Sequence, residues 1–391
     1  MKLETQRELL SRVATHQKNG TTDMADRCLR VPAQHYTSGQ QLLREVDQLF
    51  RKQPLLVGLT PDVPTPGSYM THEAADTGLI VVRGDDNKVR AFINACRHRG
   101  ARIAEGRGMR RTFSCPFHAW NYARDGKLIS RPNSCGGFDT LPDKTGNEFS
   151  ALLERPCLEI AGMIFVLLEG DGIEAKVQQM VGGMLDEIGN YAIADKVYFE
   201  SRHAQRPCNY KFMIDGFCES YHLSTLHKNT ISPYYYTNPA LTDLFGPVAR
   251  MIGVRSSIDT EWAKDETERR FLRHGTIQYL MPPNIVLTHQ VDHIQLWQIY
   301  PVANDPNQCS VSFSLYWPAP MDEAAQAKCK FNIDVIWKIT NEEDFPQSVN
   351  IHNNLASGAI GELVFGRNEP SLIHYHKQIA ARIGSELISD I

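Results

Sequence analysis

Four residues, Cys96, His98, Cys115 and His118, have the types and the spacing of a metal site. One residue separates Cys96 from His98, and two residues separate Cys115 from His118. Two thiolates and two imidazoles could hold a tetrahedral zinc ion, but zinc sites usually pair Cys with Cys and His with His at such short spacings. One Cys and one His on each arm suit a two-iron centre better, with both thiolates on one iron and both imidazoles on the other. The pattern therefore predicts Rieske-type [2Fe–2S] ligation, in which the imidazoles raise the reduction potential.

A second group of candidate ligands begins at Asn209 and contains His222 and His227. The two histidines are five residues apart, about 140° around a regular helix. They can converge on one metal ion only if the helix ends, kinks or bulges between them. Asp215 and Glu219 precede His222 by seven and three residues, which predicts that all three share one helix face. A carboxylate so placed can orient a metal-ligating imidazole through its second nitrogen.

A non-haem Fe(II) site that activates oxygen needs two histidines, one carboxylate and open coordination positions. The carboxylate must come from elsewhere in the chain, and the run Glu342-Glu343-Asp344 is the candidate. Spacing alone does not choose among these three acids. Because Phe345-Pro346 follows, Asp344 could also simply cap the N-terminus of a helix.

Composition limits the classes of protein to which the chain can belong. Its 391 residues suffice for two or three domains, and its net charge of −4 does not suggest a nucleic acid or an anionic membrane as partner. The longest apolar run, residues 160–168, is too short to span a membrane, and the first residues lack the apolar stretch of a signal peptide. Nine scattered cysteines fit a reducing compartment better than a disulfide framework. We therefore expect a cytoplasmic protein.

The periodicity of apolar residues indicates which elements position these side chains. Helices are expected around residues 4–13 and 38–51. From about residue 53 to 156 the chain consists of short β-rich runs cut by turns, with the Cys and His arms on loops between strands. Later strands alternate with longer helical patterns and include a hairpin around Val291-Asp292, in which His289 and His293 are expected to be structural. Gly100 and Pro116 are typical of tight loops.

These residues and their surroundings resemble the α (catalytic) subunits of Rieske non-haem iron aromatic-ring-hydroxylating oxygenases. The resemblance covers nearly the whole chain, and none of its departures, such as Tyr210 where Trp is common, removes a metal ligand. The matching stretches are Phe92-Ile93-Asn94-Ala95-Cys96-Arg97-His98-Arg99-Gly100, Cys115-Pro116-Phe117-His118-Ala119-Trp120, Asn209-Tyr210-Lys211, Glu219-Ser220-Tyr221-His222 with His227, Glu343-Asp344, and Gly366-Arg367-Asn368-Glu369-Pro370.

The resemblance implies two metal cofactors per chain, with O2 as co-substrate. One is a [2Fe–2S] Rieske cluster, held by Cys96, His98, Cys115 and His118. The other is a mononuclear Fe(II), held by His222, His227 and Asp344. Glu219 takes the place of the family's bridging acid, which links an iron-site histidine to a cluster histidine of the neighbouring subunit, and Asp215 is the second catalytic candidate.

The implied fold class is α+β, with a β-rich Rieske [2Fe–2S] domain and a helix-grip catalytic domain whose curved antiparallel sheet wraps a long helix. The expected domains are an N-terminal helical segment at 1–40 that packs on the catalytic domain, the Rieske domain at 41–156 and the catalytic domain at 157–391. Such subunits usually assemble as homotrimers, with or without a small β subunit. Ile214, Phe217 and Cys218 are expected to line the substrate pocket.

The implied function is that of a terminal oxygenase component. It would take electrons from an NAD(P)H-fed reductase, directly or through a ferredoxin, and mono- or dihydroxylate a small aromatic or cyclic substrate. Three arginines near the cluster have two interpretations. They form a docking surface for an acidic ferredoxin or reductase, or they are solvated loop charges; they are Arg97, Arg99 and Arg102. One alternative is an oxidative N- or O-demethylase of the same fold. Another is a non-catalytic electron carrier or ligand-binding module, which would have no use for His222, His227 and Asp344.

Overall fold

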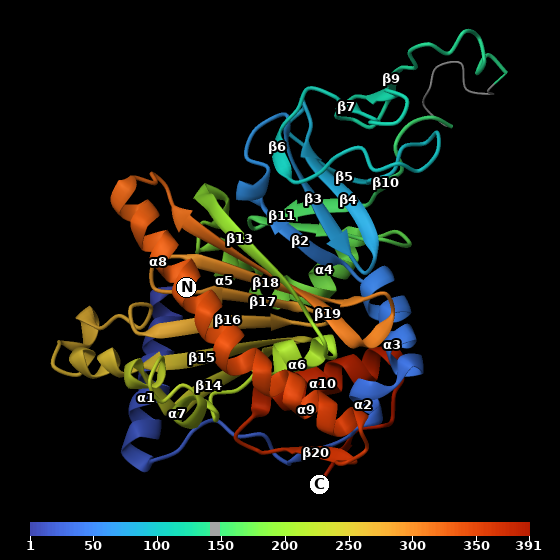
Figure 1. Ribbon diagram of the computed structural model, residues 1–391. Coiled ribbons are helices and arrows are strands. Elements are labelled where there is room, and N and C mark those ends of the chain that lie inside the picture. The colour runs from blue at the N-terminus through green and yellow to red at the C-terminus, as the bar shows by residue number, and fades with distance from the viewer. Residues whose placement is uncertain (141–148) are drawn as a thin grey trace. The chain divides into compact units, whose positions relative to one another are not determined.

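The computed structural model describes residues 1–140 and 149–391, and the chain divides into two compact units (Figure 1). One unit is Phe50–Val177, and the other combines Met1–Leu49 with Gln178–Ile391. Residues 141–148 of the expected Rieske domain lie outside the described residues. Within the described ranges, none of the helices has both the length and the apolar character needed to cross a membrane.

The Phe50–Val177 unit consists mainly of short antiparallel strands. Its described strands pair in the orders β10-β5-β4-β3-β6, β11-β12-β2 and β7-β8-β9. The expected short β-rich runs are confirmed, and β4 and β5 among them form an antiparallel hairpin. The strands are β2 (Leu55–Leu59), β3 (Ser68–Ala74), β4 (Thr77–Arg83), β5 (Val89–Ile93), β6 (Arg107–Met109), β7 (Phe113–Ser114), β8 (Asn121–Tyr122), β9 (Leu128–Ser130), β10 (Glu154–Arg155), β11 (Cys157–Ile160) and β12 (Met163–Val166).

The larger unit is organised around a seven-stranded antiparallel sheet of order β13-β19-β18-β17-β16-β15-β14. Consecutive strands in the chain are hydrogen-bonded neighbours from β14 to β19, and β13 pairs with β19 at the edge. The predicted hairpin around Val291-Asp292 is the β17–β18 pair. The strands are β13 (Lys196–Arg206), β14 (Tyr235–Phe245), β15 (Val248–Arg255), β16 (Gly275–Met281), β17 (Ile285–His289), β18 (Ile294–Val302) and β19 (Asp305–Pro318).

Helices cover this sheet and bring the candidate ligands to it. Helix α6 packs on β18 and β19, α8 on β13 and β19, α10 on β15 and α1 on β14. Helices α8 and α9 are joined by a π-helical turn at Thr340–Asp344, so together they form one long helical segment. This arrangement confirms the predicted α+β class with an antiparallel sheet beside a long helix. The helices are α1 (Leu3–Asn19), α2 (Gln34–Thr37), α3 (Gly39–Glu45), α4 (Ile173–Val181), α5 (Leu185–Gly189), α6 (Tyr210–Asp215), α7 (Leu223–Leu226), α8 (Glu323–Ile339), α9 (Phe345–Ala356) and α10 (Pro370–Ile383).

The ends of the chain belong to the larger unit. Strand β1 (Leu29–Pro32) pairs with β20 (Glu362–Phe365) and β21 (Ser389–Asp390). Helix α1 buries Leu9, Leu10 and Val13 and is longer than predicted, because it continues until Gly20 ends it with φ of 63°.

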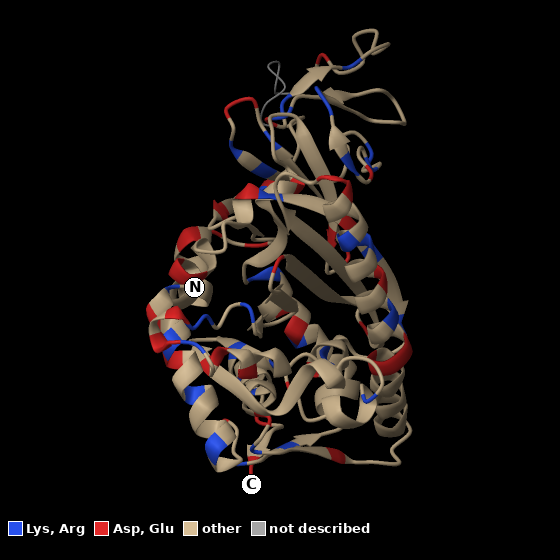
Figure 2. Ribbon diagram, turned by 90° about the vertical axis from the view of Figure 1, so that its left-hand side faces the viewer, with Lys and Arg blue, Asp and Glu red and all other residues tan. Residues whose placement is uncertain are grey.

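The smaller unit runs from 50 to 177 where the predicted Rieske domain runs from 41 to 156, since β11 and β12 pair with β2. Acidic and basic residues are interspersed along the helices (Figure 2), in keeping with the small net charge.

Candidate functional site

The two Cys–His arms of the smaller unit form closed loops of the same design. In each arm the cysteine N–H donates to the carbonyl oxygen five residues later, at 2.8 Å. The cysteine carbonyl accepts from the N–H four residues later, at 2.8 Å after Cys96 and 3.0 Å after Cys115. The donors of these last bonds, Gly100 and Ala119, have φ of 74° and 54°. Gly100 is thus needed for its tight loop as the sequence predicted, whereas Ala119 adopts the same conformation with a side chain.

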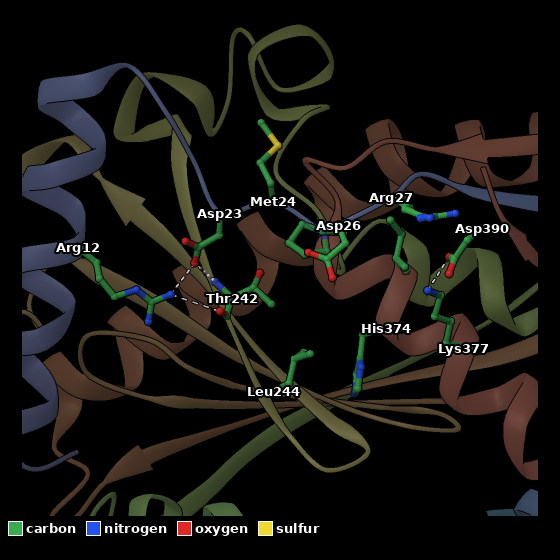
Figure 3. A pocket seen from close by; sticks show the side chains of 13 residues that line it. Arg12, Asp23, Met24, Asp26, Arg27, Thr242, Leu244, His374, Lys377 and Asp390 are labelled. Carbon is green, nitrogen blue, oxygen red and sulfur yellow. Dashed lines mark hydrogen bonds and ion pairs between the residues drawn. The ribbon is translucent and has the colours of Figure 1, made fainter.

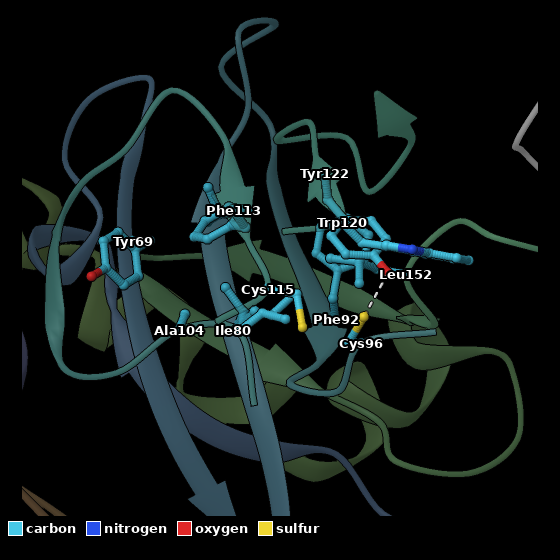
Figure 4. Packing of buried hydrophobic residues seen from close by; sticks show 12 residues of the cluster. Tyr69, Ile80, Phe92, Cys96, Ala104, Phe113, Cys115, Trp120, Tyr122 and Leu152 are labelled. Carbon is cyan, nitrogen blue, oxygen red and sulfur yellow. Dashed lines mark hydrogen bonds between the residues drawn. The ribbon is translucent and has the colours of Figure 1, made fainter. Parts of the chain in front are cut away.

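These loops bury the thiols and leave the imidazoles at the surface. Cys96 and Cys115 are 4% and 3% exposed, within a hydrophobic cluster that includes Phe92 (Figure 4). His118 is exposed and His98 half-buried, and their ring centroids are 4.6 Å apart. A cluster bound here would therefore have its sulfur ligands inside and its histidine ligands facing outward.

The donor set fits a two-iron cluster better than a zinc ion. Nδ1 of His98 is buried without a hydrogen-bond partner among the described residues, as expected of a nitrogen that binds metal. Tyr122 Oη lies 3.2 Å from Sγ of Cys96 and accepts the N–H of Arg97 at 3.1 Å. Zinc ligands at ~2.0–2.3 Å from one ion lie within about 4 Å of each other. No three of the four donor residues, all of them described, bring their ligand atoms within 4.8 Å of one another.

In the larger unit, His222 and His227 stand at the two ends of the four-residue helix α7. Asn209 caps the preceding helix α6 by accepting the N–H of Lys211 at 3.1 Å, and α6 already ends at Asp215. The condition that the helix ends, kinks or bulges between the two histidines is met, because α7 ends at Leu226 and His227 is its non-helical C-cap with φ of −95° and ψ of 22°. The centroids of the two rings lie 5.1 Å apart. The predicted helix face shared by Asp215, Glu219 and His222 is wrong, because no helix connects these three residues.

Asp344 completes a group of three ligands. Its Oδ1 lies 3.1 Å from Nε2 of His227 and 3.6 Å from Nε2 of His222. The three ligand atoms lie within 4.8 Å of one another, which no other set of His, Cys, Asp or Glu does in the part of the chain that the structure describes. Asp344 ends the π-helical turn and directly precedes α9, but its side chain makes no capping hydrogen bond to that helix. Two imidazoles and one carboxylate are the donor set of non-haem Fe(II) sites, so the residues fit this ion.

The outer nitrogens of both histidines are held by carboxylates. Glu219 contacts Nδ1 of His222 and also accepts the backbone N–H of that residue at 3.1 Å. Glu343 Oε2 lies 2.6 Å from Nδ1 of His227 and accepts the hydroxyl of Thr230 at 2.9 Å. Such partners would leave Nε2 of each ring unprotonated and able to bind a metal ion. Burial lowers the pKa of His227, but Asp344 and Glu343 outweigh it and raise that pKa overall.

The structure separates the three acids that spacing could not. Asp344 faces both imidazoles, Glu343 holds the outer nitrogen of His227, and Glu342 has a side chain 64% exposed to solvent. Sequence reasoning had not given Glu343 this role, and the only signal for it is that it precedes Asp344.

The second catalytic candidate, Asp215, accepts hydrogen bonds from Tyr36 at 2.7 Å and from His376 at 2.9 Å.

A cavity of about 160 Å3 opens beside the three candidate ligands. Phe217 lines it as predicted, whereas Ile214 and Cys218 do not and are buried in the core, 1% exposed each. A second cavity of about 370 Å3 shares Glu219, His222 and Asp344 with the first. It also contains Glu369, whose pKa is raised to about 7 by burial and by neighbouring acids.

A larger cavity of about 560 Å3 contains none of the candidate ligands (Figure 3). Arg12 in its wall is paired with Asp23 and with Asp243, the latter at 2.7 Å, and Lys377 is paired with Asp390 at 2.6 Å. Its charges thus neutralise one another, and the candidate reactive site is the smaller cavity beside His222, His227 and Asp344.

Two family models match this chain. A Rieske [2Fe–2S] domain matches residues 53–141, and the catalytic domain of ring hydroxylating alpha subunits matches residues 193–385. Among similar proteins, the carnitine monooxygenase oxygenase subunit of Acinetobacter baumannii is 28% identical over 199 residues, which are 50% of this chain and 52% of that protein. The benzene 1,2-dioxygenase subunit alpha of Pseudomonas putida is 27% identical over 268 residues, 66% of this chain and 54% of that protein. The matches thus span about half the length of these relatives.

Solved structures agree on the fold. A crystal structure of a quaternary ammonium Rieske monooxygenase has a TM-score of 0.77 with 20% identity, covering 92% of this chain and 96% of that one. The Rieske match contains both Cys–His arms, and the catalytic match contains His222, His227 and Asp344. By these matches the chain belongs to the α-subunit family of Rieske ring-hydroxylating oxygenases, in which a Rieske [2Fe–2S] domain precedes a catalytic domain that binds mononuclear iron.

Proposed function

We propose that this chain is a terminal oxygenase component that uses O2 to hydroxylate a small aromatic or cyclic substrate. The observation that carries the proposal is the group of His222, His227 and Asp344, whose ligand atoms face one another while both outer imidazole nitrogens are held by carboxylates. A purely structural ion would be enclosed by its ligands. These three residues line a cavity, so positions beside them remain open to a substrate.

Separate sets of residues would hold the two metal centres and orient their ligands. Cys96, His98, Cys115 and His118 would hold the cluster, and His222, His227 and Asp344 would hold the iron. When bound, the cluster supplies single electrons and the iron supplies a site for O2. Glu219 and Glu343 keep the two imidazoles oriented with Nε2 toward the metal. The cavity walls exclude water around the substrate.

Electrons would come from a reductase, with or without a ferredoxin, and we propose a homotrimer with or without a β subunit. In this arrangement Glu219 links His222 to a cluster histidine of the neighbouring subunit. The position of Glu219 in the wall of the second cavity supports this role, since a side chain from another molecule could reach it there. Of the arginines near the cluster loops, Arg99 is exposed, while Arg102 pairs with Glu73 at 3.0 Å.

Oxidative N- or O-demethylation is a second candidate function. It would use the same site, because hydroxylation of a methyl group bound to nitrogen or oxygen gives an unstable product that releases formaldehyde. The similar proteins support it, since they include oxygenase subunits named for carnitine and for glycine betaine. Localisation in the cytoplasm stays part of the proposal.

The test is oxygen uptake by the reduced holoprotein with aromatic hydrocarbons, aromatic acids, neutral substituted rings and methylammonium compounds. Substrate-dependent oxygen consumption with a hydroxylated product supports the first function, and release of formaldehyde supports the second. An iron-loaded and reducible protein that consumes no oxygen with any compound would instead be an electron carrier or a binding module.

A further inference from the structure

The cavity beside the candidate iron ligands has one polar wall, formed by the sheet. Gln278 on β16, Thr288 on β17 and Gln295 on β18 line it. They are direct cross-strand neighbours, Gln278 opposite Thr288 and Thr288 opposite Gln295, so their side chains project from the same face of the sheet. We call these three residues the amide row.

The amide row keeps unused hydrogen-bonding capacity. Within the described chain, Gln278 and the hydroxyl of Thr288 have no side-chain hydrogen-bond partner. Gln295 donates from Nε2 to His293 at 2.8 Å, which leaves its carbonyl oxygen free. Thr288 and Gln295 are nevertheless 2% and 3% exposed. None of their free polar atoms is among the fully buried atoms without a partner, so these atoms are accessible from the cavity, where water or the polar group of a ligand can satisfy them.

The opposite walls of the cavity are mostly apolar. Apart from Thr340, Ser348, Glu219 and the candidate iron ligands, the lining from the segments around α6 and α7 and from the α8–α9 segment is apolar and includes Met213, Phe217, Leu223, Ile231, Ile336 and Phe345. The volume of about 160 Å3 is close to the ~150 Å3 of an engineered cavity that binds benzene. The site therefore suits a molecule of about one ring, with an apolar body and one hydrogen-bonding group.

Anionic substrates do not match the lining. No Lys or Arg lines the cavity, whereas Glu219 and Asp344 do. A carboxylate would therefore lose its water and gain no Lys or Arg partner from the lining. The amides of the row can bind a neutral oxygen or N–H group without this cost.

Cationic substrates are disfavoured by the way in which the aromatic residues are already used. The guanidinium of Arg255 lies 5.2 Å from the ring centre of Tyr235, and that of Arg206 lies 5.2 Å from the ring centre of Phe345. A quaternary ammonium group is usually bound by free aromatic faces. Two of the three aromatic rings in the lining thus already have a guanidinium over one face, and the third, Phe217, packs against Trp297 at 5.0 Å between ring centroids, so the lining offers no free aromatic cage.

Resting on the proposed oxygenase function, we infer that the substrate is a neutral, single-ring-sized molecule with an amide or hydroxyl group that binds Gln278, Thr288 and Gln295. The amide row makes the cavity bind neutral polar compounds more tightly than aromatic acids or quaternary ammonium compounds.

The experiment measures binding to the anaerobic holoprotein by calorimetry with five probes of similar size: benzamide, benzyl alcohol, toluene, benzoate and phenyltrimethylammonium. We expect benzamide and benzyl alcohol to bind about ten-fold more tightly than toluene, because each can form one or two hydrogen bonds that toluene cannot. Benzoate and phenyltrimethylammonium should bind more weakly than toluene.

Variants of the amide row then test whether these residues cause the preference for benzamide over toluene. Gln278→Leu and Thr288→Val, the second of which conserves shape, should each weaken benzamide binding several-fold and leave toluene binding unchanged or stronger. Gln205→Leu, an exposed position on β13 outside the cavity, is the matched control and should change neither. The visible spectrum of the cluster confirms that each variant is folded.

The outcomes separate this inference from the proposed function. Tighter binding of benzoate or phenyltrimethylammonium, equal binding of benzamide to Gln278→Leu, Thr288→Val and the parent, or no binding of any probe overturns the inference. Oxygen uptake is measured with the same probes. Oxygen uptake with the cationic probe would support the oxygenase function and contradict the role of the amide row. The expected binding order without oxygen uptake would support the role of the amide row and contradict the oxygenase function.

Discussion

Glu343 holds the outer nitrogen of His227, with its Oε2 2.6 Å from Nδ1 of that ring. The next residue in the chain, Asp344, faces the other nitrogen of the same ring. Two consecutive acids thus act on opposite sides of one imidazole. The π-helical turn makes this possible, because it departs from the regular spacing of side chains around α8 and α9.

Replacement of Asp344 should remove the mononuclear iron alone. We expect about three irons and two acid-labile sulfides per chain in the parent and about two irons in Asp344→Ala, with the cluster spectrum intact and oxygenation lost. Glu343→Ala should keep the iron but bind it about ten-fold or more weakly, since it loses only an orienting partner. The exposed Glu342→Ala is the control. Iron loss in Glu343→Ala with a normal Asp344→Ala would mean that the wrong acid is assigned.

Glu219→Gln should leave both metal centres filled while slowing electron transfer between them by orders of magnitude. The amide keeps the size of the side chain but removes the charge that orients and polarises His222. The measurement is single turnover, in which the reduced protein receives substrate and O2 and reoxidation of the cluster is followed. A variant that reoxidises as fast as the parent shows that Glu219 only positions the backbone at His222.

Lys211→Met should destabilise the larger unit by about 3–5 kcal/mol, because it leaves a buried carboxylate without its partner. Lys211 Nζ lies 2.7 Å from both carboxylate oxygens of Glu45, and both side chains are fully buried. The double variant Lys211→Met/Glu45→Leu should recover a large part of this loss in urea unfolding.

The matched control is the exposed pair of Lys338 and Glu342, whose side chains are 69% and 64% exposed. Lys338→Met should cost less than about 1 kcal/mol. Equal losses in Lys211→Met and Lys338→Met would contradict the prediction, as would a double variant less stable than Lys211→Met.

Acid should weaken the fold through His289. Burial, helped by the charge of Lys196, lowers the pKa of His289 to about 3, so the folded protein keeps this ring neutral. An unfolded histidine takes up a proton near its usual pKa of about 6.5. The contribution of His289 to the free energy of unfolding is therefore fully present above pH ~6.5, and it is lost as the pH drops from there toward 3.

The measurement is the free energy of unfolding between pH 8 and pH 5 for the parent and for His289→Gln. The variant should take up about one proton fewer on unfolding, so its stability should fall less steeply with acid. The slope is the readout, because the substitution also removes the stacking of His289 on Tyr191 at every pH. Parallel slopes would show that His289 is already charged in the folded protein.

The local features of this fold could be predicted, and the features that depend on distant contacts could not. The β4–β5 and β17–β18 hairpins follow from short-range turn and strand patterns. The shared helix face of Asp215 and His222 failed, because helical spacing cannot show that α6 stops at Asp215. That Asp215 bonds Tyr36 and His376 depends on segments more than a hundred residues away.

The same distinction holds within the site. The Cys–His arms carry their ligands in short loops, so their spacing alone predicted the class of cofactor. The amide row joins three strands, and each of its members looks in the sequence like an ordinary polar residue. Only the register of β16, β17 and β18 shows that Gln278, Thr288 and Gln295 are neighbours.

The π-helical turn at Thr340–Asp344 makes the iron site sensitive to chain length as well as to side-chain chemistry. A widened helical turn contains one residue more than the regular helix around it, and such turns are tolerated where function requires them. Deleting one residue from this turn would leave every candidate ligand in the sequence. It would nevertheless rotate Asp344 and all of α9 about the helix axis relative to α8, by ~100°. The geometry of the candidate iron site thus depends on the number of peptide units in this turn, which no substitution of a side chain can restore.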